Sequence, residues 1–221
     1  MNEQIDLIVF DWDGTLVDSV GKILQCVELT FELKGFKPPS RASAKALIGK
    51  SLPIFMQTLL PHEDESTIQD LCQQYRWNWN HGDLPVIKTF PGVLQMLTSL
   101  NEQGFLQAIA TGKSRGGLMI DMERLNLSDY FRVTRCADES GSKPDPAMLN
   151  WICTQLDINP ERTLVVGDTT HDLEMAKRAG AKSAGVLSGC HTVQQLSKFD
   201  PLAIFEKTTD ILGWLKNESN P

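Results

Sequence analysis

The sequence predicts an α/β protein, a Rossmann-like parallel sheet with a smaller all-helical domain inserted after the first strand. A short apolar run at 5–10 ends in a turn that contains two aspartates. Strand and helix patterns alternate from about residue 90 onward, which predicts parallel strands joined by right-handed helical crossovers. Between these two regions, residues 17–85 carry helical periodicity and no convincing strand.

The first strand is predicted at 5–10, because this run is rich in Ile, Leu and Val and is followed by a glycine-containing turn. Asp11 and Asp13 come directly after it, at the strand end where open α/β sheets bind ligands. One carboxylate could attack an electrophile while the other handles protons, with a divalent cation holding both. A plain strand cap and turn would also explain these residues, since Asp, Gly and Thr are common in turns.

The inserted segment begins with an amphipathic helix. Its apolar residues recur at helical spacing and are Val20, Ile23, Leu24, Val27 and Phe31. Further helices are expected near 42–48, 52–59 and 66–79. We therefore expect a core domain of residues 1–16 and 86–221 and a helical cap domain of residues 17–85, placed to act as a lid over the ligand end of the sheet.

The second half repeats the strand–helix pattern. Its strands are expected at 105–110, 130–133, 163–166, 184–187 and 202–205, and its helices at 91–104, 118–125, 145–152 and 173–180. Asp145 and Pro146 resemble an N-cap and a first-turn proline. Gly180 fits a helix stop.

Composition excludes several classes of function. The net charge of -7 argues against nucleic acid or an anionic membrane as partner. The five cysteines are scattered, which indicates reduced, mostly buried thiols in a cytoplasmic protein. We find no signal peptide and no apolar run of membrane-spanning length. The sequence does not distinguish a monomer from a homodimer.

Four polar clusters fall at strand ends or just before helices. They are Asp11/Asp13, Thr111, Lys143 and Asp168/Asp172. In this order, the segments D-W-D-G-T-L-V-D-S, Thr111, K-P-D-P and G-D-T-T-H-D resemble the four motifs of the haloacid dehalogenase superfamily. The helical insertion resembles the type 1 cap of its phosphoglycolate-phosphatase-like members.

The resemblance implies a mechanism. Asp11 would attack phosphorus and form an aspartyl-phosphate, and Mg²⁺ would be held by Asp11, the backbone carbonyl of Asp13, and Asp168, with Asp172 as a ligand or support. Asp13 would be the general acid and then the base. The dehalogenase branch lacks that aspartate, so its presence indicates phosphoryl chemistry.

The same resemblance implies a phosphate-binding set. Its members are Gly14, Thr15, Thr111, Gly112 and Lys143, with the Lys143 charge opposing charge that develops in the transition state. Taken singly, Thr111 could be an ordinary strand-end hydroxyl and Lys143 a surface charge. Asp168 and Asp172 could be helix-capping acids. The functional interpretation rests on all four clusters occurring in order.

Several further polar or aromatic residues lie in or near the motifs. We expect His171 to be a bystander in a variable motif position and His191 to lie at the surface. Lys113 begins a polar segment where a second anionic group could bind, but we expect a solvated helix start there. Trp77 and Trp79 cannot share one helical face and are assigned no ligand role.

Substrate specificity is expected from the cap loop Gly49, Lys50 and Ser51, which resembles the family's loop that points into the active site. The predicted function is hydrolysis of a small phosphorylated metabolite by a Mg²⁺-dependent phosphatase. A β-phosphoglucomutase-like enzyme, a pyrophosphatase, or a phosphonoacetaldehyde hydrolase using Lys50 as a Schiff-base amine would share the core. A non-catalytic binding module is the alternative from a different class.

Overall fold

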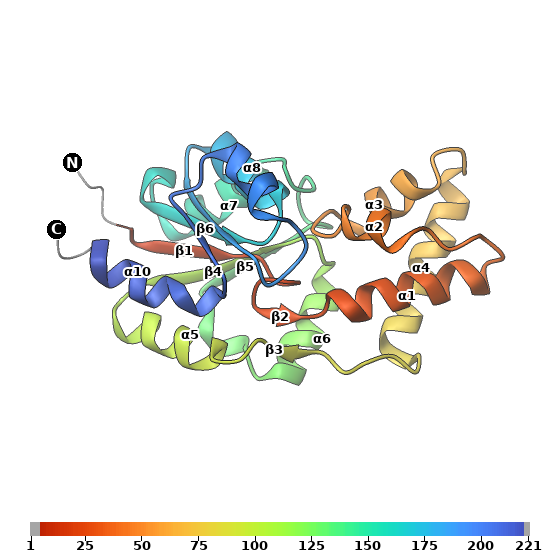
Figure 1. Cartoon of the computed structure of the whole chain (residues 1–221), viewed down its shortest axis with the longest axis horizontal. Helices are drawn as coiled ribbons and strands as arrows, with labels where there is room; N and C mark the ends of the chain where they lie inside the picture. Colours follow the sequence, from red (N-terminus) through yellow and green to blue (C-terminus); the bar gives the residue numbers. More distant parts are fainter. Residues whose placement is uncertain (1–4, 219–221) are drawn as a thin grey trace.

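The computed structural model describes residues 5–218 and confirms the predicted α/β architecture (Figure 1). Six parallel strands form one sheet in the order β5-β4-β1-β6-β7-β8. Their bounds are β1 Leu7–Phe10, β4 Leu106–Thr111, β5 Val133–Cys136, β6 Thr163–Gly167, β7 Lys182–Val186 and β8 Ala203–Phe205. The chain adds strands on one side of β1 and then returns to add strands on the other, so the ends of β1, β4 and β6 are neighbours.

Helices cover both faces of this sheet, as Figure 1 shows. On one face lie α7 (Ala147–Leu156) and α8 (Thr170–Ala179). On the other lie α5 (Val93–Glu102), α6 (Arg115–Leu125) and α10 (Ile211–Glu218). Alternate residues of β1 serve the two cores, because successive strand side chains point to opposite faces. All four residues of β1 are buried, which explains its continuous apolar sequence.

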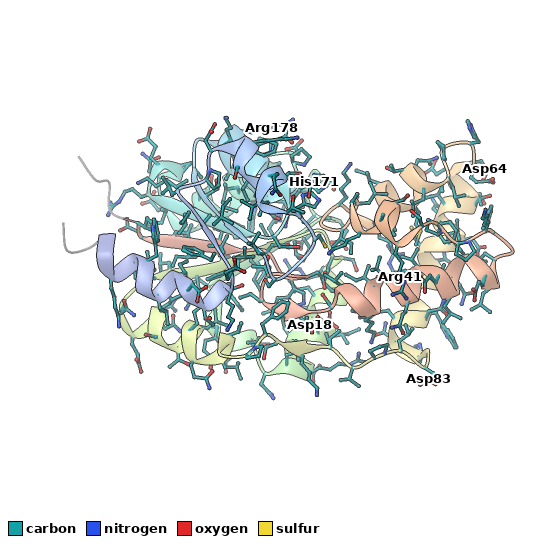
Figure 2. The ribbon with its side chains drawn as sticks, viewed as in Figure 1. Asp18, Arg41, Asp64, Asp83, His171 and Arg178 are labelled. Atoms are coloured by element: carbon teal, nitrogen blue, oxygen red, sulfur yellow. The ribbon has the colours of Figure 1, made fainter. Side chains whose placement is uncertain are left out.

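Four helices form a separate lobe beside the sheet, here called the helical lobe. They are α1 (Val20–Leu33), α2 (Arg41–Lys45), α3 (Leu52–Leu59) and α4 (Glu65–His81). Asp64 caps the far end of α4, accepting the Thr67 N–H at 2.8 Å (Figure 2). In the buried contact between α1 and α4, the Asn78 amide donates to Thr30 Oγ1 at 3.0 Å. The expected helical insertion after the first strand is therefore present.

Several boundaries differ from the sequence-based expectation. A small antiparallel ladder pairs β2 (Val17–Asp18) with β3 (Lys88–Thr89), where the chain enters and leaves the lobe. It was missed because two-residue strands leave no periodicity. The strand expected at 130–133 lies at β5, because Ser128–Tyr130 forms a 3₁₀ turn. Helix α7 begins one residue late, with Pro146 as its N-cap, although Asp145 still accepts the Ala147 N–H.

The remaining elements are short. They are α9 (Val193–Leu196) and the 3₁₀ turns Pro160–Arg162, Ser197–Phe199 and Thr208–Asp210. Within residues 5–218, no helix is both long and apolar enough to cross a membrane. All five cysteines are buried and none forms a disulfide. These thiols therefore contribute to packing.

Candidate active site

Strand β1 delivers Asp11 and Asp13 to the edge of the sheet. The Asp11 N–H donates to the Val166 carbonyl at 2.9 Å, which extends the β1–β6 ladder by one residue. Asp11 is 2% exposed and Asp13 8%. Asp11 Oδ2 and Asp13 Oδ1 are buried and have no hydrogen-bond partner within residues 5–218. Buried acceptors without partners are costly, so these two oxygens mark the place where an external group would bind.

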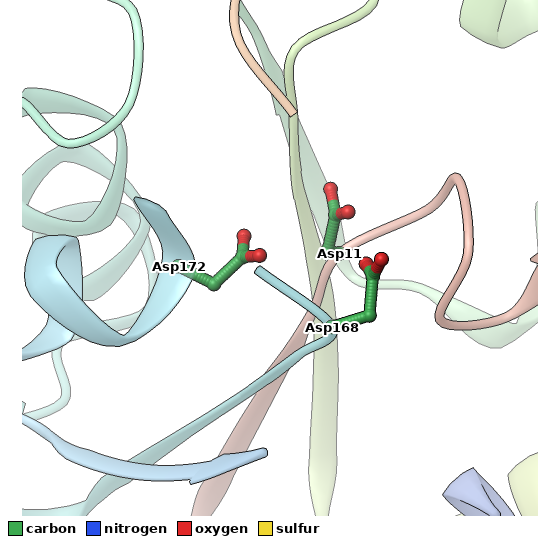
Figure 3. A group of neighbouring side chains, drawn as sticks. All are labelled: Asp11, Asp168 and Asp172. Carbon is green, nitrogen blue, oxygen red and sulfur yellow. The ribbon is translucent and has the colours of Figure 1, made fainter. Parts of the chain in front are cut away.

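Two more carboxylates converge on Asp11 from β6 and α8. Asp168 follows β6, and Asp172 lies in the first turn of α8 (Figure 3). One oxygen from each of the three residues lies within 4.8 Å of the others, and all three are buried. Burial and the neighbouring Asp172 charge raise the pKa of Asp168 to about 7. Such a group of hard oxygen donors suits a divalent cation.

Asp168 is oriented by the turn that follows β1. Its Oδ1 accepts the Thr15 hydroxyl at 3.0 Å, and its Oδ2 accepts the Cys190 N–H at 2.7 Å. Gly14 has φ +83°, and a Cβ there would lie 2.6 Å from Asp168 Oδ2. Only glycine allows this close approach. Thr15 is fully buried with its hydroxyl bonded to Asp168, and its role in phosphate binding stays a prediction.

Lys143 links the acidic groups from the loop before α7. Its Nζ lies 2.5 Å from Asp11 Oδ1 and 2.6 Å from Asp172 Oδ1, and the residue is 1% exposed. Burial alone would lower the pKa of Lys143, but the two carboxylates raise it overall. The other oxygen of Asp172 accepts the Thr169 hydroxyl at 2.7 Å. Lys143 is therefore a buried cation held between Asp11 and Asp172, and it is not a surface charge.

A loop of the helical lobe is docked on the core. The Ser51 N–H donates to Ser142 Oγ at 2.8 Å. At Gly112, directly after β4, a Cβ would lie 2.5 Å from the Gly49 carbonyl oxygen and 2.6 Å from that of Lys50. Glycine at position 112 is therefore needed because the lobe's backbone occupies the space of a side chain.

A cavity of about 370 Å³ opens between the lobe and the core. It is lined by seven of the predicted site residues, Asp11, Asp13, Thr111, Gly112, Gly49, Lys50 and Ser51. The other five, Gly14, Thr15, Lys143, Asp168 and Asp172, are not part of the lining, and Lys143 contacts it through Asp11. Thr111 is 1% exposed, and its Oγ1 accepts the Lys113 N–H at 3.2 Å. Predicted residues from the core and from the lobe therefore line the same cavity.

The structure adds a network that the sequence did not predict. Lys113 Nζ lies 2.9 Å from Asp121 Oδ2, 3.6 Å from Asp13 Oδ2 and 4.2 Å from the centre of the Trp79 ring. The Trp79 indole N–H points to Asp121 Oδ1 at 3.4 Å, joining α4 to α6. The solvated position expected for Lys113 is wrong. The sequence feature that could have predicted this burial is Asp121, a carboxylate on the apolar face of α6 between the buried Leu118 and Met122.

The two histidines near the acidic group are both largely buried. His171 lies at the end of α8 that faces the lobe (Figure 2), and a Cβ on Gly49 would be 3.7 Å from its ring. His191 is 8% exposed, and its Nδ1 accepts the Thr170 N–H at 2.9 Å, so the surface position predicted for it is wrong. Burial lowers the pKa of both rings.

Residues 8–186 match the family model described as haloacid dehalogenase-like hydrolase. The chain belongs to this family. A relative named "Probable phosphatase IndB" from Dickeya dadantii is 35% identical over 224 residues, which cover 97% of this chain and 97% of the relative. A pyrophosphatase PpaX from Anoxybacillus flavithermus is 29% identical, covering 96% of this chain and 97% of the relative.

The fold of this haloacid dehalogenase-like chain is also found among solved structures. A crystal structure of a "putative haloacid dehalogenase-like hydrolase" from Bacteroides fragilis superposes with a TM-score of 0.87 at 27% identity. The match covers 94% of this chain and 100% of that one. Both the sheet and the inserted helices are therefore shared with a known member of the family. The resemblance inferred from the four motifs is confirmed.

Proposed function

We propose that this protein is a Mg²⁺-dependent phosphatase that hydrolyses a small phosphorylated metabolite through an aspartyl-phosphate on Asp11. One observation carries the proposal. Asp11 Oδ2 is buried without a hydrogen-bond partner in residues 5–218, at the end of a cavity that Asp13 and Thr111 also line. This oxygen has no competing hydrogen bond within the described residues and belongs to a residue that lines the cavity, so it could attack a group bound there.

In the first step, Asp11 would attack phosphorus while the bond from phosphorus to the leaving oxygen breaks. Asp13 would give its proton to that oxygen, which leaves as an alcohol. In the second step, Asp13 would take a proton from water as the water attacks phosphorus and the bond from phosphorus to the Asp11 oxygen breaks. Inorganic phosphate then leaves, and both aspartates return to their first state. General acid–base help of this kind typically contributes roughly 10²–10⁴-fold.

Lys143 and Thr111 would stabilise the transferring group. The Lys143 ammonium already contacts Asp11 Oδ1 at 2.5 Å, so it lies beside the oxygen next to the attacking one. Asp172 holds the ammonium from the other side at 2.6 Å. A cation fixed before the reaction needs no reorganisation when negative charge develops on the phosphoryl oxygens.

The donor set fits Mg²⁺. The residues that would hold the ion are Asp11, the backbone carbonyl of Asp13, and Asp168, with Asp172 completing the buried acidic group. When bound, the ion would neutralise phosphoryl oxygens that otherwise repel Asp11. The hydrogen bonds from Thr15 and Cys190 keep Asp168 aimed at the same point. Fixed ligands of this kind are typical of catalytic metal sites.

We further propose that residues 17–85 are a cap domain over a core of residues 1–16 and 86–221. The support is the docked loop at Gly49–Ser51, which closes one wall of the cavity. Closing the cavity would exclude bulk water from the aspartyl-phosphate. Lys50 is partly exposed, which does not fit the desolvated pocket that a Schiff-base lysine occupies.

The test is phosphate release from a panel of esters with Mg²⁺ and with chelator, comparing the wild type with Asp11→Asn. The proposal predicts release that needs both Mg²⁺ and Asp11. The change to Asn keeps the size of the side chain and removes the nucleophile. Release that persists in Asp11→Asn would refute the assigned nucleophile. No release from any ester would favour the binding-module alternative.

A further inference from the structure

The cavity is larger than the phosphoryl group requires. Its volume of about 370 Å³ falls within the range of roughly 300–1,000 Å³ that is usual for sites of drug-sized ligands. The phosphoryl group needs only the end bounded by Asp11 and Thr111. The remaining space extends between α1, α3 and α4 of the lobe and α6 of the core. That space is where the leaving group of a substrate would lie.

Apolar side chains form most of this remaining wall. From the lobe come Ile23, Val27, Phe55, Tyr75 and Trp79, and from α6 comes Ile120. A second phosphate or a carboxylate placed against these side chains would lose hydration without gaining a partner. An apolar or aromatic body would instead gain from leaving water, by about 25 cal/mol per Å² of buried surface.

Among residues 5–218, three cationic side chains line the cavity, and the one that is well buried is already neutralised. Lys113 lies between the carboxylates of Asp121 and Asp13, at 2.9 and 3.6 Å, with its ammonium over the Trp79 ring. Arg76 is exposed and Lys50 partly exposed, so water screens both. Within residues 5–218, the cavity therefore offers no buried, unneutralised cation for a second anionic group.

The lining also contains a neutral acceptor without a hydrogen-bond partner. Asn80 lines the cavity, and its Oδ1 is buried with no hydrogen-bond partner in residues 5–218, while its Nδ2 donates to the Arg76 carbonyl at 3.0 Å. That bond fixes which end of the amide is the oxygen. An N–H or O–H group of a ligand would satisfy the oxygen and remove the cost of its burial.

We propose that the substrate is a phosphate monoester whose leaving group is bulky and uncharged, with an apolar or aromatic ring body and at least one N–H or O–H donor, about the size of a nucleoside. This specificity rests on the proposed phosphatase activity. It separates this chain from an enzyme for pyrophosphate or phosphoglycolate, whose leaving groups are small and anionic. The apolar wall would bind the ring, and Asn80 Oδ1 would accept the donor.

The test compares kcat/KM for five substrates: the esters ethyl phosphate, phosphoglycolate, phenyl phosphate and uridine 5′-monophosphate, and the anhydride pyrophosphate. Each is measured with Mg²⁺ in the wild type and in Asp11→Asn. We expect the best bulky ester to exceed pyrophosphate and phosphoglycolate by at least 100-fold. If pyrophosphate or phosphoglycolate is hydrolysed as well as the best bulky ester or better, and this needs Asp11, the proposed specificity is refuted while the phosphatase proposal is supported. If none of the five substrates gives Asp11-dependent phosphate release, both the phosphatase proposal and the proposed specificity are refuted.

A matched pair of variants tests the wall itself. Ile120 lines the cavity and is 37% exposed, whereas its neighbour Met119 is 50% exposed and lies outside the lining. Because both side chains reach solvent, both positions should accept lysine without unfolding. Ile120→Lys should lower kcat/KM for the bulky ester at least 10-fold, mainly through KM, and raise it for pyrophosphate. Met119→Lys should change neither, and equal effects of the two variants would refute the role of the wall.

Discussion

Gly112 offers a direct test of how the helical lobe is docked, through the change Gly112→Ala. A Cβ there would lie 2.5 Å from the Gly49 carbonyl oxygen and 2.6 Å from that of Lys50, whereas ordinary contact begins near 3.4 Å. The loop would have to retreat by about 0.8 to 0.9 Å, and it cannot rotate away because both atoms belong to the backbone. Overpacking of this kind costs about 1–3 kcal/mol.

The expected result is a large loss of activity with little loss of fold. A misplacement near 1 Å can cost about 10²-fold in rate, so kcat/KM for the best ester should fall by about two orders of magnitude. The assay is steady-state phosphate release, with thermal unfolding measured on the same samples. Gly213→Ala is the control, because nothing lies within 4 Å of a Cβ at that position in α10 and Gly213 does not line the cavity. Wild-type kcat/KM in Gly112→Ala would refute the docked loop.

Three further outcomes are expected. Thr15→Val should weaken Mg²⁺ affinity by about 10-fold or more, measured by calorimetry, because it removes the bond that orients Asp168. With chelator, Asp168→Asn should be more stable than the wild type at pH 8 and lose that advantage toward pH 5. The folded pKa of Asp168 is raised from its ordinary value of 3.8 to about 7, so the stability penalty of this carboxylate builds up between about pH 4 and pH 7 and is complete above pH 7; denaturant unfolding at the two pH values checks this. Burial raises the pKa of Cys26 and Cys136 to about 12, so Ellman's reagent at pH 8 should find no fast thiol in the native protein and five after denaturation; one fast native thiol would contradict this.

Much of the fold was predictable because its strands are buried on both faces. The run at 5–10 is continuously apolar for this reason, and the glycine and aspartate after it gave the turn its signature. The two-residue ladder of β2 and β3 was not predictable, since it arises where two chain segments cross and depends on tertiary contact. Propensity alone carries little information over two residues.

The candidate site also has features that could be predicted from the sequence and features that could not. That Asp11, Thr111, Lys143 and Asp168 would lie near one another was predictable, because each stands at the end of a strand or shortly before a helix. The contact of the Thr15 hydroxyl was not predictable, because a sequence cannot show which acceptor a hydroxyl will meet. In the structure that acceptor is Asp168, 153 residues away.

Lys113 was misplaced for a related reason. A lysine at a helix start is usually solvated, and its burial here depends on carboxylates from β1 and α6 and on an indole from α4. Three elements distant in sequence make that environment together. The missed signal was Asp121, a charge at a core-facing helical position that requires a buried partner.

The central claim, a covalent phosphate on Asp11, is tested most directly by trapping it. In Asp13→Asn the second step should lose its base, while p-nitrophenyl phosphate still reacts because its leaving group needs no proton. Borohydride added to a rapidly quenched sample reduces an acyl phosphate to an alcohol, which peptide mass spectrometry can locate. We expect homoserine at position 11 in this variant and none after Asp11→Asn. Release of p-nitrophenol with no reduced residue at position 11, at any quench time, would contradict the account.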